Sequence, residues 1–261
     1  MLKLRVITSV VALVGIGVVL FAIPPLYAEL IIGLLLVAGA WEWSGFLELS
    51  SNVWRGFYAA LVTAALCAVW FSSEQTESML LLFGLGFWFI AFLFSLRFPT
   101  PIGKGLRWIS GFFVLVPLYA ALLMLFRHGV DYLLFTLMIV WAADAGAYFT
   151  GKKFGRVKLA PAISPGKTWE GVIGGLVLVG TMAVCVGLWR DLNVGVFLPF
   201  CLAVAALSVV GDLTVSMFKR TAGVKDSGSL FPGHGGVLDR IDSVAAAAPL
   251  FALGLGWLGL V

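Results

Sequence analysis

The sequence predicts an all-α integral membrane protein, a polytopic bundle of about nine transmembrane helices with a cytoplasmic N-terminus. Of its 261 residues, 61% are hydrophobic and only 11% are charged. Soluble domains carry roughly 45–50% apolar and about 25% charged residues, so a water-soluble enzyme is excluded. Disorder is excluded too, because large apolar residues are abundant while proline and charge are sparse.

Nine apolar runs are candidates for crossing the hydrocarbon core, which takes about 20 residues of helix. The runs are continuous rather than alternating, which is typical of helices and not of barrel strands. The second and the ninth are short or interrupted by glycine and are the weakest candidates. The runs lie at 6–23, 30–47, 56–72, 78–96, 108–126, 131–149, 170–189, 194–213 and 243–261.

The basic residues set the orientation, because Lys and Arg concentrate on the cytoplasmic side of membrane proteins. With nine crossings and a cytoplasmic N-terminus, 15 of the 17 Lys and Arg residues fall on that side. Arg127 and Arg190 are the two exceptions. A basic face suits anionic lipid headgroups, nucleotides or phosphates. Topology control alone is the simpler explanation for part of it.

Several acids lie near the cytoplasmic ends of the predicted spans: Asp144, Asp212, Asp226, Asp239 and Asp242. An acid inside a span is costly, and carboxylates that converge at one depth repel one another unless a cation lies among them. Such oxygen ligands suit Mg²⁺. The alternative is ion pairing with Lys219, Arg220 and Arg240. Glu42 and Glu170 have weaker claims, as a carboxylate at a helix end and as a partner of a helix dipole.

The first of two long polar loops runs from Thr150 to Thr168 and ends in Ser164-Pro165-Gly166-Lys167-Thr168. It is not a Walker A sequence, because Pro161 stands where that motif needs a glycine. A predicted helix follows directly, so backbone N–H groups, hydroxyls and Lys167 are offered to an anion. A helix cap with a topology-setting lysine is the alternative.

The second loop, between the eighth and ninth spans, is rich in charge and glycine for so hydrophobic a chain. Its run Gly233-His234-Gly235-Gly236 lets a backbone approach a ligand closely, as phosphate-binding loops require. A loop that only joins two helices has no need of this composition.

Together these residues resemble the signature of the phosphatidate cytidylyltransferase (CDP-diglyceride synthetase) family. The similar stretch is Ser216-x2-Lys219-Arg220-x4-Lys225-Asp226-x-Gly228-x2-Phe231-Pro232-x-His234-Gly235-Gly236-x2-Asp239-Arg240-x-Asp242. Two further segments are similar to the family, around Asp144 and around Ser164 to Gly171. The resemblance divides the chain into N-terminal transmembrane helices at 1–130 and a catalytic transmembrane region at 131–261, with cytoplasmic loops at 150–169 and 214–242.

The resemblance implies that CTP and phosphatidic acid give CDP-diacylglycerol and pyrophosphate, in phospholipid biosynthesis. Both substrates are polyanions, so the site must supply cations and positioning. The implied Mg²⁺ ligands are Asp212, Asp239 and Asp144, and a second cation could bridge the reacting oxygens. The implied phosphate-binding residues are Ser164, Lys167, Lys219, Arg220, Gly235, Gly236 and Arg240. Lys225, Asp226 and His234 complete the implied catalytic set, with His234 shaping the loop and donating to the leaving pyrophosphate.

The implied partners are CTP, phosphatidic acid and membrane lipids, without nucleic acid. The implied location is the cell (inner) membrane, with the active site on the cytoplasmic side. A homodimer is expected by family analogy, and the small residues Gly171-x2-Gly174-Gly175 could let helices approach closely.

Three alternatives remain at this stage. A related cytidylyltransferase acting on an ether-lipid phosphate would share the signature. An anionic-substrate transporter would instead place charges in the middle of its spans. A CDP-alcohol phosphotransferase would carry a D-G-x2-A-R…G-x3-D-x3-D pattern, which this sequence lacks.

Overall fold

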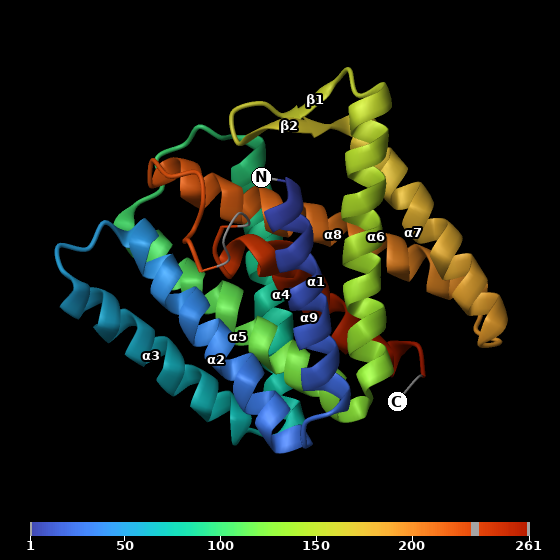
Figure 1. Cartoon of the computed structure of the whole chain (residues 1–261), viewed down its shortest axis with the longest axis horizontal. Helices are drawn as coiled ribbons and strands as arrows, with labels where there is room; N and C mark the ends of the chain where they lie inside the picture. The colour runs from blue at the N-terminus through green and yellow to red at the C-terminus, as the bar shows by residue number, and fades with distance from the viewer. Residues whose placement is uncertain (1, 231–234, 260–261) are drawn as a thin grey trace.

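The structure is a computed structural model that describes residues 2–230 and 235–259. In these residues the chain forms long α-helices, one short 3₁₀ helix and one β-hairpin (Figure 1). The helices are α1 (Leu2–Phe21), α2 (Pro25–Ser44), η1 (Gly45–Leu47), α3 (Asn52–Trp70), α4 (Glu74–Leu96), α5 (Lys104–His128), α6 (Val130–Phe154), α7 (Trp169–Trp189), α8 (Val194–Thr221) and α9 (Leu238–Trp257). The hairpin joins β1 (Lys158–Ala160) to β2 (Ser164–Thr168), which are antiparallel.

Within the described residues, seven helices are long and apolar enough to cross a membrane. They are the helices from α2, extended through η1, to α8. The class of multi-pass helical membrane protein is therefore confirmed. The predicted count of nine spans and the cytoplasmic N-terminus are not confirmed, because α1 and α9 are not among the seven.

Helix α9, like α5, forms part of the interior. It contacts α2, α4, α5, α6 and α8, and its run Ala245–Ala248 is completely buried. Small side chains let neighbouring helices pack closely around it. In its first turn Asp239 contacts Lys219 on α8, and the backbone N–H groups of Val237 and Leu238 donate to Glu42 on α2.

Helices α6 and α7 lie side by side at one edge of the molecule (Figure 1). A Cβ atom at Gly175 would come against the carbonyl oxygen of Ala143, and one at Gly171 would come 2.9 Å from the carbonyl oxygen of Ala147. The glycines expected to allow close helix approach therefore do so within the chain. This packing fixes the position of Asp144, which lies on α6 beside Ala143.

Both polar loops are shorter than predicted, because the helices run on into them. Helix α6 continues to Phe154 and α8 continues to Thr221. The rest of the first loop folds into the hairpin, where Thr168 ends β2 and caps α7 by accepting a hydrogen bond from the backbone N–H of Gly171 at 3.2 Å. The helix cap, given above as the alternative, is thus present, and Ser164 to Thr168, which precedes the helix as expected, forms a strand.

Candidate active site

Residues from the hairpin and from three helices meet around Asp212. Lys167 on β2 forms an ion pair with Asp212 on α8, with 2.5 Å between Nζ and Oδ2. The other oxygen of Asp212 accepts a hydrogen bond from Ser216 Oγ at 3.1 Å. Asp144 on α6 and Asp242 on α9 lie within electrostatic range of the same carboxylate. We call Asp144, Lys167, Asp212, Arg240 and Asp242 the Asp212 cluster, since Arg240 in turn lies within range of Asp144.

The like charges of this cluster affect one another. Asp242 is buried, and this burial together with the nearby Asp212 carboxylate raises the pKa of Asp242 above its usual range. Lys167 and Lys219 are the basic groups that act in the opposite direction on it. The convergence expected for Asp144, Asp212 and Asp242 is therefore present in the fold.

The expectation that Asp144 and Asp212 project from helix ends is wrong. Helix α6 continues for almost three turns beyond Asp144, and α8 continues for about two and a half turns beyond Asp212. The polar residues that follow each aspartate extend the helix rather than ending it. Asp239 does lie at a helix end, in the first turn of α9.

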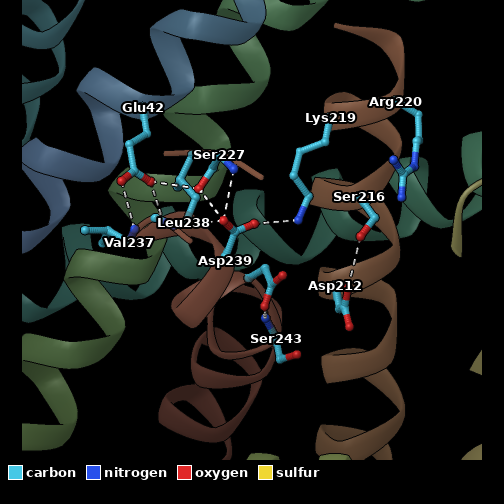
Figure 2. A network of polar contacts seen from close by, with 12 residues as sticks. Glu42, Asp212, Ser216, Lys219, Arg220, Ser227, Val237, Leu238, Asp239 and Ser243 are labelled. Atoms are coloured by element: carbon cyan, nitrogen blue, oxygen red, sulfur yellow. Dashed lines mark hydrogen bonds and ion pairs between the residues drawn. The ribbon is translucent and has the colours of Figure 1, made fainter. Parts of the chain in front are cut away.

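Asp239 belongs to a second polar group, in which both of its oxygens are occupied (Figure 2). Lys219 Nζ donates to Oδ1 at 2.6 Å, and the Ser227 hydroxyl lies 3.0 Å from Oδ2. The backbone N–H groups of Ser227 and Gly236 also donate to Oδ2, each at 2.9 Å. Burial raises the pKa of the Asp239 carboxyl, but these hydrogen bonds and the Lys219 charge outweigh it, so the pKa is lowered.

Glu42 is a site residue whose role the sequence did not reveal. It is buried at the end of α2, with 7% of its surface exposed, and accepts hydrogen bonds from the segment before α9. We had expected an interfacial carboxylate at a helix end. The sequence signal for Glu42 is an acid between Trp41 and Trp43 in an apolar run. This signal indicates an unusual position, but it does not identify the hydrogen-bond partners of Glu42, which lie about 190 residues further along the chain.

The glycines before α9 have steric reasons to be glycine. Gly235 has a φ of +85°, in the left-handed region that favours glycine. A Cβ atom on Gly236 would collide with Glu42 and with the Ser227 hydroxyl. The backbone at Gly235 and Gly236 does pass close to other groups. In the structure these groups are the Asp239 and Glu42 carboxylates of the protein itself.

The other predicted site residues lie at varying distances from these groups. Arg220 Nε donates to the carbonyl oxygen of Ile163 at 3.1 Å, which ties the hairpin turn to the end of α8. Ser164 is half-buried at the start of β2, while Lys225 and Asp226 are exposed in the loop after α8. His234 lies outside the described residues.

The two groups suit Mg²⁺ to different extents. Among the described residues there is no group of three or more His, Cys, Asp or Glu side chains that could hold a metal ion. Mg²⁺ in phosphate chemistry is usually held by one or two carboxylates, with waters and substrate phosphates completing its shell. Asp144 and Asp212 fit that pattern, because they are carboxylates in mutual range and lie near the basic residues Lys167 and Arg240. Asp239 fits it less well, since both of its oxygens already accept hydrogen bonds from donors of the protein.

Comparison with known proteins identifies the family of this chain. A sequence model of the Cytidylyltransferase family matches residues 3–257. The chain belongs to this family.

Three similar curated proteins are each named phosphatidate cytidylyltransferase. The Haemophilus influenzae protein is 38% identical over 282 residues, covering 97% of this chain and 98% of that protein. The Pseudomonas aeruginosa protein is 42% identical over 270 residues, covering 98% of this chain and 99% of that protein. The Staphylococcus aureus protein is 47% identical over 125 residues, covering 47% of this chain and 48% of that protein.

Proposed function

We propose that this protein is a phosphatidate cytidylyltransferase, which transfers the cytidylyl group of CTP to phosphatidic acid and releases pyrophosphate. The relatives that align along almost the whole chain carry this name. The observation that carries the proposal within the structure is the Asp212 cluster, where carboxylates and bases from four separate elements converge.

In this reaction a phosphate oxygen of phosphatidic acid attacks the α-phosphorus of CTP. The bond from that phosphorus to the oxygen bridging the β-phosphate breaks, and pyrophosphate leaves with the bonding electrons. A phosphomonoester is already mostly ionised at pH 7, because its second pKa is about 6. The protein therefore needs no strong base, and its task is to bring two polyanions together in line.

The basic residues of the site perform that task. Lys167 moves from Asp212 to a substrate phosphate, with Ser164 on the same strand as a hydrogen-bond donor. Arg240 supplies a further charge beside Asp144. Lys219 and the backbone around Gly236 hold the loop before α9 in place through Asp239, and that loop receives the phosphates of CTP.

We propose that Asp144 and Asp212 hold Mg²⁺, the predicted cofactor. When bound, the ion neutralises phosphate charge and orients the reacting phosphates. The prediction of Asp239 as a third ligand gains no support from this geometry. A second cation remains a prediction.

We also propose that the protein lies in the cell's inner membrane and that its active site is on the cytoplasmic side. The support is the sequence distribution of Lys and Arg and the need for CTP, which is a cytoplasmic nucleotide.

The transporter alternative predicted charges in mid-span positions, and Asp144 and Asp212 do lie within helices. Two observations favour the enzyme. The chain belongs to the cytidylyltransferase family, and Asp212 pairs with a lysine of the hairpin rather than with another transmembrane helix. This contact places the carboxylate at the edge of the bundle that bears the hairpin.

The direct test is to incubate the purified protein in detergent with Mg²⁺, phosphatidate and each nucleoside triphosphate in turn, and to measure pyrophosphate. We expect release with CTP or dCTP alone, and only when phosphatidate is present. An ether-lipid phosphate run in parallel distinguishes the two lipid classes. Release with every triphosphate, or none with CTP, would overturn the proposal.

A further inference from the structure

We infer that Glu42, on α2, is a positioning residue for the loop that binds the phosphates of CTP. The loop is the segment between α8 and α9, described at 222–230 and 235–237, and we call it the 222–237 loop. The inference rests on the proposed function, and it gives an N-terminal helix a part in the site.

The Glu42 carboxylate holds the 222–237 loop at both of its ends (Figure 2). Near the end of the loop, Oε1 accepts from the backbone N–H of Val237 at 2.9 Å and Oε2 accepts from that of Leu238 at 3.0 Å. Near its beginning, the Ser227 hydroxyl lies 2.9 Å from Oε2. One buried side chain therefore contacts the loop at Ser227 and again where the loop enters α9.

Glu42 also meets a need at the start of α9. The first N–H groups of a helix have no partner within the helix and carry its positive dipole end. Val237, the residue before the helix, provides no side-chain cap. Glu42 supplies the missing acceptors, and it does so with a negative charge, which suits this end of the helix.

The helix that carries Glu42 is itself firmly held. The neighbouring Trp43 is completely buried, and its Nε1 donates to the carbonyl oxygen of Arg107 at 3.0 Å. Its ring packs against Phe218 on α8, with 5.0 Å between ring centroids. The carboxylate is therefore a fixed point on α2, and the loop adapts to it.

Two glycines of the loop leave room for the carboxylate. A Cβ atom on Gly228 would come 2.5 Å from Glu42 Oε1, and one on Gly236 would collide with Oε2. The backbone at Gly228 and at Gly236 thus lies so close to the Glu42 carboxylate that a residue with a Cβ atom would not fit at either position. Two positions of the family-like signature are in this way explained by a residue outside it.

Ser227 couples Glu42 to Asp239. Its hydroxyl lies 2.9 Å from Glu42 Oε2 and 3.0 Å from Asp239 Oδ2, and it has one proton to donate. Asp239 in turn holds Lys219. A displacement of Glu42 therefore reaches the Lys219 ammonium through three contacts, by way of Ser227 and Asp239, and so reaches the charges that surround CTP.

The decisive variant is Glu42→Gln, which keeps the size of the side chain. An amide has one acceptor oxygen, and its NH₂ group would face an N–H or hydroxyl donor where the second carboxylate oxygen stood. We expect the KM for CTP to rise about tenfold, the effect of losing one such buried contact. We expect kcat and the KM for phosphatidate to change less than threefold, because the Asp212 cluster is untouched.

The matched control is Glu48→Gln, which removes a carboxylate six residues further on whose ion pairs lie with Lys104 and Arg107, away from the loop. It should leave the KM for CTP unchanged. If Glu42→Gln does not fold, Ser227→Ala tests the same connection, with a smaller rise in the same constant. Equal losses for both substrates, or a fall in kcat at constant KM, would show that Glu42 does not position the CTP loop.

A second measurement does not depend on the activity. Amide hydrogen exchange at Ser227, Gly236, Val237 and Leu238 should accelerate at least tenfold in Glu42→Gln, while exchange in α7 stays as in the wild type. If wild-type protein released no pyrophosphate from CTP, the proposed function would fail, yet this local exchange would still test the anchoring. Unchanged exchange in the loop, or faster exchange throughout the chain, would contradict the inference.

Discussion

The molecule holds two groups of charges among its helices, and they are built differently. One is the Asp212 cluster. The other, which we call the Glu29 cluster, consists of Glu29, Trp70, Glu77 and Arg127 at the ends of α2 to α5. Glu29 and Glu42 lie on the same helix, about 20 Å apart along its axis, so the Glu29 cluster is near the end of α2 opposite to Glu42 and its contacts at the start of α9.

The Glu29 cluster is closed. Arg127 donates to both oxygens of Glu29, at 3.0 and 3.2 Å, and to Glu77 at 3.1 Å. Trp70 Nε1 adds a hydrogen bond to Glu29 at 2.6 Å. This fork-like guanidinium pairing fixes the geometry. Here the charges hold four helices together.

The Asp212 cluster is open by comparison. Asp212 has a close partner in Lys167, but Asp144 and Asp242 interact with it as like charges. Carboxylates in mutual repulsion gain from an added cation, and a lysine paired with one of them can be exchanged onto a phosphate. The two clusters thus differ in how their charges are held: one guanidinium hydrogen-bonds both acids of the Glu29 cluster, whereas Asp144 and Asp242 act on Asp212 as like charges, which suits the proposed binding of a cation and of substrate phosphates.

The largest expected effect follows from breaking the open cluster. Asp212→Asn should lower kcat/KM for CTP on the order of 10³-fold, because it removes a proposed Mg²⁺ ligand and the partner of Lys167. Pyrophosphate release measures this. Asp131→Asn is the charge-matched control, since its carboxylate pairs with Arg190 in an exposed position. Near-normal Mg²⁺-dependent activity in Asp212→Asn would remove this residue from the site.

Breaking the closed cluster should change stability instead. Arg127→Met leaves Glu77, which is 1% exposed, without its cation, and removing one partner of a buried pair costs about 3 kcal/mol or more. We expect a lower unfolding midpoint in detergent but an unchanged kcat/KM in the folded fraction. The exposed pair of Arg190 and Asp131 supplies the control, Arg190→Met. Lost activity in folded Arg127→Met would mean that the two clusters are coupled.

The two clusters also differ in how far the sequence revealed them. The acids near Asp212 stood out because they interrupt apolar runs close to a glycine-rich, basic loop. Arg127 was expected only as one of two bases on the outer side. Its pairing with Glu29, 98 residues away, depends on how four helices pack, and no local pattern encodes that.

The same limit applied within the site. The helical membrane class and the converging residues Asp144, Lys167 and Asp212 follow from composition, span ends and loop chemistry. The capping of α9 by Glu42 and the saturation of Asp239 do not, because each depends on a contact that the folded chain makes between distant segments. Helix lengths were underestimated for a related reason: polar residues end a span but not a helix.

Lys167 offers a finer test of the open cluster. Lys167→Met should raise the KM for CTP roughly tenfold, since one phosphate partner is lost. It should also lower the Mg²⁺ concentration needed for half-maximal rate, because Asp212 is relieved of a competing cation. Lys167→Arg, which keeps the charge, is the control. Its KM for CTP and its Mg²⁺ requirement should lie between those of the wild type and those of Lys167→Met. A higher Mg²⁺ requirement in Lys167→Met would show that the lysine assists the ion instead of competing with it.

The smallest effect is expected at Glu48, at the same end of α2 as Glu42 but exposed. The hydrogen bond and charge of Arg107 lower the pKa of the Glu48 carboxyl. A carboxyl whose pKa is lowered on folding stabilises the folded state. The full contribution is present at pH values above the ordinary pKa of 4.5, and it is lost as the pH falls through the lowered pKa. The unfolding temperature of Glu48→Gln should therefore lie slightly below that of the wild type at pH 7, and the difference should vanish on acidification. The loss should be small because Glu48 is exposed and the buried Arg107 keeps its hydrogen bonds to the carbonyl oxygens of Ile102 and Phe46. A deficit as large as that of Arg127→Met would contradict this ranking.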